Sequence, residues 1–540
     1  MIHVREAKIE DVHAISEIFR TSYGEDYAYP LFYDKNWLTR LVFADDTVLL
    51  VAEDTQNEQV LGTASVVSGI GGYNDLVGEF GRLAVHPDAR GRGIGSLLME
   101  GRLERVKDRL HLGLVENRVA HEFSQRISAK FDFVPIGFVP QKLPVHRREP
   151  VACFARYFGD ALQLRRNNPR VIPEACELAS IVLHNCGLPN DPVIDDSSAP
   201  FPYETSFELE ELTTEGYTSL LRIQRGRVRG RDIFGPVRLH YGMFQLKAKH
   251  SHYYIARRAG HIAGGIGFMV DPTERNVRIF ELISINDEPI RLLLSHLLDQ
   301  CRTHFGAEFV EVDVSAYAPR MQRTLLELGF LPVSYIPASV FHEVERLDAI
   351  KMVTLLIPFE MKQLHISAML RPIADHVIRN FMSLEELPLI TSTAEHARLF
   401  QGLNAEQRRR LVNICEPRSF AAGDEIFACG EQYTEMHLVL SGEASLWSCD
   451  GAQVGEVQSG QCLGEATLLE QGRALPVHSL RAQAEGPVET VLFDRDAVVS
   501  LIRRRPDIGV VIYRNLAADV SAKLRARTTA AEIPPTDFPV

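Results

Sequence analysis

A glycine-rich loop between a predicted strand and a predicted helix is the part of the sequence best suited to chemistry. It runs from Leu83 to Leu98 with the sequence LAVHPDARGRGIGSLL. At such a junction, successive backbone N–H groups and the N-terminus of the helix converge and form a site for a pyrophosphate. Gly91, Gly93 and Gly95 lack the Cβ atoms that would block a close approach. The alternative is an ordinary glycine turn without a ligand.

The same motif resembles the signature of the GNAT acyltransferases, Arg/Gln-x-x-Gly-x-Gly/Ala, with Arg90, Gly93 and Gly95 at its fixed positions. The resemblance implies that the loop holds the pyrophosphate of acyl-CoA, normally acetyl-CoA. It also implies that a backbone N–H near Val85, at the end of a splayed strand, polarises the thioester carbonyl as an oxyanion hole does. The residues that it assigns to the acyl-CoA site are Leu83, Ala84, Val85, Arg90, Gly91, Arg92, Gly93, Ile94, Gly95 and Ser96.

The resemblance also implies a general base. An amine with a pKa of about 10 is almost wholly protonated at neutral pH and cannot attack a thioester. Glu79 stands fourteen residues before Gly93, where many family members carry a glutamate base on their fourth strand. Glu79 is therefore the predicted catalytic residue. The alternative is an edge carboxylate that pairs with Arg82 or Arg102, since such ion pairs are common.

The general acid is not assigned by the motif. Family members often carry a tyrosine shortly before a closing Gly-Phe, but here residues 121–128, before Asp132-Phe133, contain none. Tyr23, Tyr27 and Tyr29 lie where a loop on the acceptor side is expected. They form either a packing cluster or a source of the acid. A water molecule that protonates the thiolate is the remaining alternative.

A further glycine turn lies near the C-terminus, in the sequence GQCLGEATLL at residues 460–469. Together with GDEIFACGE at 423–431 and LVLSGE at 438–443, it resembles the cyclic-nucleotide-binding domains. The resemblance implies that Glu465, flanked by Gly464 and Ala466, accepts hydrogen bonds from the ribose 2′-hydroxyl. It further implies that N–H groups of the following short helix hold the cyclic phosphate.

The arginine that should neutralise this phosphate departs from the family pattern. Arg473-Ala474 supplies the Arg-Ala pair one residue early, and Pro476 interrupts the strand that should follow. Cyclic AMP is the effector that the resemblance predicts. The alternative is a roll that keeps the fold but binds nothing, because a fold does not guarantee its ligand.

The elements that position these sites follow from apolar periodicity. In residues 1–148 strands are predicted at 3–7, 48–52, 61–68 and 76–85, with a helix opened by Asp11. Residues 149–359 repeat this plan, with helices at 173–185 and 289–305 and strands at 253–257, 262–270, 277–285 and 309–314. The order predicts an internal duplication.

The second α/β region resembles a GNAT fold that has lost its cofactor loop. Residues 286–291, NDEPIR, have no glycine and place Asp287 and Glu288 where a pyrophosphate would bind. We expect this region to cover the first domain or to shape the acceptor groove. A run of arginines, at 222, 225, 227, 229 and 231, forms either a site that binds an acidic substrate or a solvated basic loop.

The predicted fold class is α/β multidomain: a GNAT fold (1–148), a degenerate GNAT-like unit (149–359), a helical connector (360–396), a β-roll of the cyclic-nucleotide-binding type (397–527) and a tail (528–540). A final helix is expected from about 506 to 527. The spacing of the glycine turns after residue 399 is typical of a small roll.

Composition limits the classes of function. Hydrophobic residues make up 45% and charged residues 24%, as in ordinary globular proteins, and no apolar run approaches the roughly 20 residues of a membrane span. We therefore expect a cytoplasmic protein without a membrane partner. The net charge of −13 opposes binding to nucleic acid. The eight cysteines form no CxxC pair and no His/Cys cluster, so reduced cysteines and no metal site are expected.

Taken together, these patterns predict an acyl-CoA-dependent N-acyltransferase that is regulated by a cyclic nucleotide. The pairing resembles the bacterial protein lysine acetyltransferases controlled by cyclic AMP, although their sensor usually precedes the enzyme. The amine acceptor is either a protein lysine or a small molecule. The alternative class is a non-enzymatic scaffold that responds to a cyclic nucleotide, which the intact Glu79, Arg90, Gly93 and Gly95 argue against.

Overall fold

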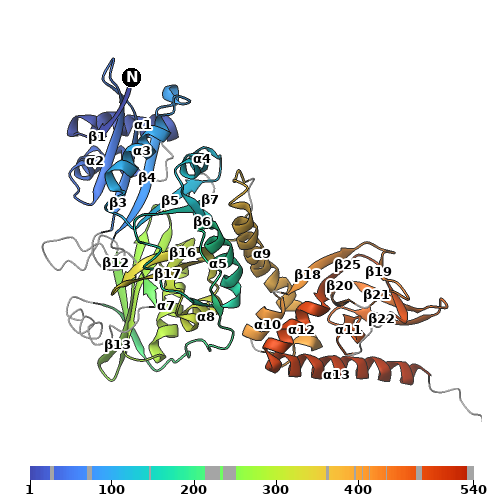
Figure 1. The fold of residues 1–540 in the computed structure, drawn as a ribbon. Helices are drawn as coiled ribbons and strands as arrows, with labels where there is room; N and C mark the ends of the chain where they lie inside the picture. Colours follow the sequence, from blue (N-terminus) through green and yellow to red (C-terminus); the bar gives the residue numbers. More distant parts are fainter. Residues whose placement is uncertain are drawn as a thin grey trace, which may run out of the picture. The chain divides into compact units, whose positions relative to one another are not determined.

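The computed structural model divides the chain into two compact units, Met1–Phe381 and Met382–Val540 (Figure 1). It describes residues 1–24, 30–69, 76–144, 148–212, 232–234, 251–360, 364–394, 397–403, 405–412, 414–432, 434–469 and 477–531. Each unit is described by itself. In the described part of the chain, no helix combines the length and the apolar character needed to span a membrane.

The first half of the N-terminal unit is a sheet with helices on both faces. Its strands are β1 (Ile2–Glu6), β2 (Thr47–Asp54), β3 (Gln59–Ser68), β4 (Val77–Val85), β5 (Leu112–Arg118), β6 (Val134–Leu143) and β7 (Glu149–Tyr157). Its helices are α1 (Val12–Tyr23), α2 (Lys35–Val42), α3 (Ile94–Val106) and α4 (Phe123–Lys130), with short 3-10 helices η1 (Ile9–Asp11), η2 (Pro30–Tyr33) and η4 (Pro87–Ala89). The strands are ordered β1-β2-β3-β4-β5-β7-β6.

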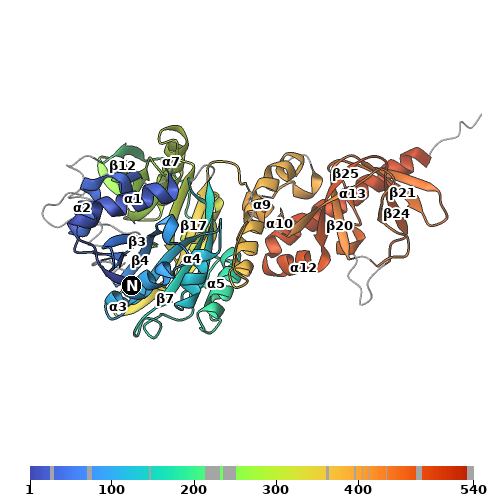
Figure 2. The same cartoon turned by 90° about the horizontal axis from the view of Figure 1, so that it is seen from above.

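Alternation along the strands creates one apolar core on each face of this sheet. Leu49 and Val51 of β2 pack with α1 and α2, whereas Leu50 and Ala52 pack with Ile94 and the rest of α3. Successive side chains of a strand point to opposite faces, so both faces of β2 are buried. Figure 2 shows α1 and α3 on opposite sides of β3 and β4.

The second half of this unit repeats the plan. Its strands are β8 (Arg170–Val171), β9 (Val193–Ile194), β10 (Glu208–Glu211), β11 (Ile233–Phe234), β12 (Ser251–Arg258), β13 (His261–Asp271), β14 (Asn276–Ser284), β15 (Phe309–Ser315), β16 (Leu331–His342) and β17 (Glu345–Leu355). Its helices are α5 (Pro173–Asn185), α7 (Glu288–Thr303) and α8 (Pro319–Glu327). The order β10-β12-β13-β14-β15-β17-β16 matches that of the first half, strand for strand.

The direction of the strands also repeats. The parallel pairs of the large sheet are β4–β5 in the first half and β14–β15 in the second, and the other pairs described within it are antiparallel. The two halves thus agree in the order and the direction of their strands, while the internal duplication itself stays a prediction. A sheet with the same arrangement of strands in both halves is what a duplicated sequence produces.

The two halves share one continuous sheet of 15 strands, joined where β6 meets β16. Ser334 lies opposite Gly137 at this seam, and its hydroxyl donates to the Ile136 carbonyl at 2.9 Å. A Cβ added to Gly137 would lie 2.3 Å from the Ser334 Cβ. Glycine is required there because the two strands approach so closely.

The C-terminal unit contains a β-roll and the helices that pack on it. Two four-stranded sheets have the orders β18-β25-β20-β23 and β19-β24-β21-β22. The strands are β18 (Cys415–Phe420), β19 (Glu425–Phe427), β20 (Glu435–Ser441), β21 (Glu443–Ser448), β22 (Gln453–Gln458), β23 (Cys462–Leu463), β24 (Leu480–Ala484) and β25 (Val488–Asp494). The helices are α9 (Arg371–Ala394), whose last part lies in this unit, η6 (Arg398–Phe400), α10 (Ala405–Val412), α11 (Ala466–Leu469), α12 (Arg495–Arg504) and α13 (Pro506–Ala531).

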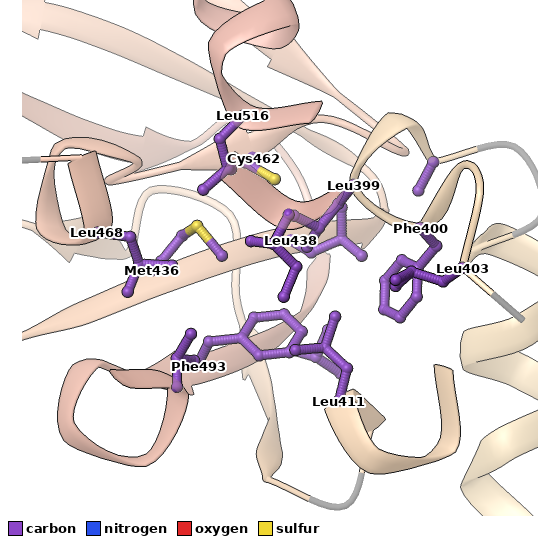
Figure 3. Close-up of a cluster of buried hydrophobic side chains, with 14 of the residues drawn as sticks. Leu399, Phe400, Leu403, Leu411, Met436, Leu438, Cys462, Leu468, Phe493 and Leu516 are labelled. Atoms are coloured by element: carbon purple, nitrogen blue, oxygen red, sulfur yellow. The ribbon is translucent and has the colours of Figure 1, made fainter. Parts of the chain in front are cut away.

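A buried apolar cluster joins the roll to these helices (Figure 3). Met436 and Leu438 of β20 meet Phe493 of β25 and Leu516 of α13 in this cluster. Each is at most 1% exposed. Helix α13 is thus held against the roll by side chains that burial removes from water.

The predicted mixed α/β fold with a C-terminal β-roll is confirmed. One expectation about the cysteines was wrong, because Cys429 and Cys449 form a disulfide with a Cα–Cα distance of 5.8 Å. The two residues are twenty positions apart in sequence, and the return of the chain in the roll brings them together. The other six cysteines are free.

Candidate functional site

The glycine-rich loop begins where β4 ends and leads directly into α3. Gly91 and Gly93 have φ angles of 79° and 76°, which side chains rarely adopt. A Cβ added to either would meet no other atom within 4 Å. The side of both glycines where a Cβ would stand is therefore open. The first N–H groups of α3 have no partner within the helix and lie at the same end of the loop. This is the geometry of an anion site at the N-terminus of a long helix.

The third glycine of the motif has a different role. A Cβ added to Gly95 would lie 2.8 Å from the Ile127 side chain of α4, so this glycine lets α3 and α4 approach. Ile94 is 2% exposed and belongs to the core beneath α3. Ser96 donates its backbone N–H to the Gly93 carbonyl and so closes the first turn of the helix. The expectation that Gly95 frees space for the phosphate is corrected by this contact.

The two arginines of the loop differ in their surroundings. Arg92 forms an ion pair with Asp54 at 3.1 Å, and Asp54 also binds the N-terminal ammonium. Arg90 is exposed and forms no hydrogen bond through its side chain within the described residues. Arg90 is therefore the loop cation that is available for a phosphate.

Strand β4 leaves β5 beside this loop. The two strands pair only as far as Phe80 and Val115, whereas β4 continues to Val85 along β3. We call this divergence the first splay. Arg82, with a φ of 57°, lies at the irregularity of β4 where the divergence begins. A bulge of this kind bends a strand and redirects its backbone groups.

Val85 presents its backbone to the first splay. The N–H of His86 donates to the Leu61 carbonyl of β3 at 2.8 Å, and the Val85 carbonyl accepts instead from the Ser22 hydroxyl at 3.3 Å. Because backbone groups alternate in direction along an antiparallel ladder, the Val85 N–H also points away from β3. The side chains of Leu83 and Ala84 belong to the cores on the two faces. These three residues would therefore meet a ligand through their backbone.

Glu79 lies on the face of the sheet opposite α3. Its neighbour Phe80 is buried under the Arg102 guanidinium of α3, and successive residues of a strand face opposite ways. Glu79 is exposed, and no hydrogen bond or ion pair joins it to another described residue. Arg102 donates to the carbonyls of Ser65 and Gly81, and Arg82 to the Ser65 hydroxyl. The expected alternative, an ion pair of Glu79 with either arginine, is absent from the described residues.

Tyr23 is the described member of the predicted tyrosine cluster; Tyr27 and Tyr29 lie outside the described residues. Its ring stacks on Phe19 at 6.1 Å. Burial raises the pKa of its hydroxyl, although Arg118 and Arg90 oppose this shift. The phenol therefore stays protonated at neutral pH and lies within electrostatic reach of the loop. Tyr23 therefore packs in the core and also lies near the glycine-rich loop.

Charged residues of both halves lie on the face of the sheet that carries Glu79. Lys142 of β6 pairs with Glu116 of β5 at 2.6 Å and with Glu311 of β15 at 3.3 Å. Burial would lower the pKa of Lys142, but these two carboxylates outweigh it and raise the pKa well above its usual range. Burial would lower the pKa of Arg278 of β14, but Glu311 and Asp313 raise it. Glu79 adds a smaller attraction, so Arg278 lies within its electrostatic reach. Both halves thus contribute charge around the predicted base.

Arg278 occupies the position in the second half that Glu79 occupies in the first. Glu79 lies opposite Leu114, two residues after the parallel pair β4–β5 begins. Arg278 lies opposite Glu311, likewise two residues after the pair β14–β15 begins. An arginine at this position cannot act as a base, because its pKa is too high.

The second half also fills the divergence that corresponds to the first splay. Strand β14 separates from β15 after Ile279, and β11 pairs with β15 beyond that point. Ile233 and Phe234 of β11 are 2% and 3% exposed. Asp287 and Glu288, where a phosphate loop would stand, form ion pairs with Arg320 and Arg258. Residues of the chain itself thus occupy this second divergence.

In the roll, the turn before Glu465 is restricted to glycine. Gly464 has a φ of 77°, and a Cβ there would lie 2.9 Å from the Glu435 carbonyl oxygen. Glu465 and Ala466 follow at the start of α11. Arg473 and Ala474 lie outside the described residues, as do the arginines at positions 222–231. The structure therefore places Gly464, Glu465 and Ala466 together in one turn.

Three contributors to these sites are not apparent in the motifs. Ser22 and Arg278 lie far from the motifs in sequence, and only the folded sheet brings them near Val85 and Glu79. The other is Lys523 of α13, which pairs with Glu465 across 58 positions. A lysine in an amphipathic helix carries no sequence signal for such a contact.

Two family models match the chain. Residues 45–131 match the acetyltransferase (GNAT) domain, and residues 417–505 match the cyclic nucleotide-binding domain. Among curated proteins, Glutaminase 2 of Bradyrhizobium diazoefficiens is 24% identical over 159 residues, or 29% of this chain and 24% of that protein. The chain thus spans about a quarter of the length of the curated relatives it matches.

Solved structures match the chain over between a quarter and a third of its length. A GNAT superfamily phosphinothricin acetyltransferase from Sinorhizobium meliloti, in complex with acetyl-CoA, is 22% identical, with a TM-score of 0.27 over 29% of this chain and 89% of that one. A cyclic nucleotide-binding domain from Methylobacillus flagellatus is 19% identical, with a TM-score of 0.25 over 28% and 88%. The domain matches confirm both resemblances drawn from the motifs.

Proposed function

Since the chain carries a GNAT acetyltransferase domain and a cyclic nucleotide-binding domain, we propose that it transfers an acetyl group from acetyl-CoA to an amine, under the control of a cyclic nucleotide. One observation supports the enzyme above all: the first splay opens beside a loop whose Gly91 and Gly93 face open space where a Cβ would stand. The proposed base Glu79 and the thioester donor Val85 then follow each other along β4, and the phosphate loop comes directly after this strand.

In this proposal each group has one task. Arg90 and the N–H groups of residues 91–95 hold the pyrophosphate. The Val85 N–H donates to the thioester oxygen as negative charge develops on it, which stabilises the tetrahedral intermediate. Glu79, on the acceptor face, takes a proton from the bound ammonium, directly or through one water, and the neutral amine then attacks the thioester carbon. Tyr23 returns a proton to the departing thiolate.

We further propose that the second half is a degenerate copy that binds no acyl-CoA. Arg278 at the position of the base, β11 within the second divergence and the ion-paired Asp287 and Glu288 support this. In this proposal the second half forms one side of the acceptor site, through the charged residues around Lys142. The boundary predicted at residue 148 falls before β7, which lies between β5 and β6 of the first half, so we place this boundary after β7. The boundary at residue 359 remains part of the proposal.

Incubation with acetyl-CoA tests the enzyme directly. The purified chain is mixed with a small-molecule amine panel or with a dialysed lysate, with and without cyclic AMP, and acetylated products are identified by mass spectrometry. Acetylated lysines or a single acetylated amine would identify the acceptor. Hydrolysis of acetyl-CoA at the background rate in every mixture would contradict the proposal and favour a binding protein.

The substitution Tyr23→Phe should slow acetyl transfer by about 10²-fold, which is the lower end of the usual contribution of a general acid. The ring and its stacking on Phe19 are kept, so the thermal midpoint should change little. Tyr33→Phe is the matched control, since Tyr33 belongs to the same core but donates to the Gly24 carbonyl. Equal kcat values for the two variants would assign the acid to water instead.

The roll should bind cyclic AMP through Glu465 and Arg473. We expect Glu465→Ala and Arg473→Ala to weaken binding and to remove the effect of the nucleotide on the rate, with the unliganded rate unchanged. A coupling of about 1 to 3 kcal/mol would change acyl-CoA or acceptor affinity by roughly 5- to 150-fold. Titration with cyclic AMP and cyclic GMP during turnover measures this. Tight binding with an unchanged rate would contradict the coupling alone.

A further inference from the structure

Helix α13 reaches the proposed nucleotide site through one lysine. The Lys523 ammonium pairs with the Glu465 carboxylate and donates a hydrogen bond to the Cys462 carbonyl. Asp519, one helical turn earlier, lies 3.4 Å from the same nitrogen. The ammonium therefore donates two hydrogen bonds, to Glu465 and to Cys462, and Asp519 adds an ion pair without a hydrogen bond.

This contact is largely removed from solvent. The Glu465 and Asp519 side chains are 13% and 9% exposed, and that of Lys523 is 26% exposed. Burial would lower the pKa of Lys523, but the attraction of Glu465 and Asp519 exceeds this effect and raises it. The lysine is therefore charged at neutral pH. A partly desolvated ion pair of this kind is stronger than a pair at the surface.

The lysine is in place because α13 is docked in the apolar cluster of Figure 3. Ile508, Ile512 and Leu516 project into that cluster at intervals of four residues. Lys523 follows Leu516 by seven residues, or two helical turns, so it lies on the same face of the helix. Figure 3 shows Leu516 next to Cys462, whose carbonyl Lys523 also binds. The end of α13 and the turn at Gly464 are thus tied together.

We propose that Lys523 is a latch that competes with the cyclic nucleotide for Glu465. This inference rests on the proposed nucleotide site. Glu465 is the carboxylate predicted to accept the ribose hydroxyl, and the ammonium already occupies it. A neutral hydroxyl gains less from this carboxylate than a charged donor does. Binding therefore requires the lysine to leave, and its departure frees the last turns of α13.

Loss of the latch should tighten nucleotide binding. Lys523→Met removes the charge but keeps the length of the side chain, so contacts of the stem with α13 survive. A hydrogen bond to a charged group contributes about 1.5 to 3 kcal/mol, so cyclic AMP should bind the variant roughly 10-fold more tightly or better. Arg525→Met is the control, since it removes the same charge from the same helix two residues later. Calorimetry on the full chain with cyclic AMP and cyclic GMP supplies the affinities.

Hydrogen exchange gives a second measure that needs no nucleotide. Amides in residues 516–525 should exchange faster in Lys523→Met than in the wild type, and addition of cyclic AMP to the wild type should have the same effect. Lys523→Arg keeps the charge and should behave as the wild type in both experiments.

The possible results separate the latch from the site itself. Equal nucleotide affinity for Lys523→Met and the wild type would overturn the latch and leave the nucleotide site standing. Weaker binding by the variant would overturn the latch too, since Lys523 would then be a ligand of the nucleotide. No binding by any form of the chain would overturn the proposed nucleotide site, and the latch with it.

Discussion

Replacing Glu79 with glutamine should lower kcat by about 10² to 10⁴ at neutral pH, the usual contribution of a general base. Glutamine keeps the size of the side chain but cannot accept a proton from the attacking amine. The dissociation constant of acetyl-CoA should not change, because Glu79 lies on the face of the sheet opposite α3. Single-turnover measurements with saturating acetyl-CoA give the rate of the chemical step.

Rising pH should reduce the defect of this variant. The free amine fraction increases about tenfold per pH unit below the amine pKa of about 10, so the variant gains rate where the wild type gains less. Glu116→Gln is the matched comparison: Glu116 lies on the same face one strand away, but Lys142 binds its carboxylate. We expect Glu116→Gln to keep most of the wild-type rate. Parallel pH profiles for Glu79→Gln and the wild type would exclude Glu79 as the base.

Replacing Gly93 with valine should abolish the binding of acetyl-CoA. Gly93 has a φ of 76°, where a β-branched residue is a strong outlier, and its new methyl groups would cover the open side of the loop. Loss of two hydrogen bonds to a phosphate, at roughly 1.5 to 3 kcal/mol each, weakens binding more than 100-fold. Calorimetry with the intact chain measures the affinity and the stoichiometry.

The wild type should bind one molar equivalent of acetyl-CoA, because the chain itself fills the second half with β11. Gly159→Val is the control for backbone strain, since Gly159 also has a positive φ, of 52°, with nothing within 4 Å of an added Cβ. It should bind acetyl-CoA as the wild type does. One equivalent remaining in Gly93→Val would move the site to the second half, and two equivalents in the wild type would refute its degeneracy.

Local patterns predicted the elements of this protein closely. Helix α5 runs from Pro173 to Asn185 as the apolar period and the N-terminal proline indicated, and β4 ends at Val85 before His86-Pro87. The glycine-rich loop between β4 and α3 was also predictable from a local pattern. Its conformation depends on a few consecutive residues, and glycine at positions 91 and 93 permits the required φ angles.

Local sequence patterns could not predict the contacts between distant parts of the chain. Cys429 and Cys449 bond because strands return in the roll, and neither residue lies in a recognisable spacing. The approach of Arg278 to Glu79 depends on how one sheet curves over many strands. Gly95 was predicted to face the phosphate, but its contact with Ile127 depends on the angle between two helices. Such features arise from tertiary packing, which local propensity does not encode.

The seam at Gly137 and Ser334 has a consequence for how this protein can be divided. A chain cut after β7 would leave β6 as a bare edge strand, with free N–H and C=O groups ready to pair with another molecule. It would also leave Lys142 without Glu311, one of its two carboxylate partners. The boundary between the two halves is therefore not a place where the N-terminal unit can be separated, because the second half covers the edge of the sheet of the first.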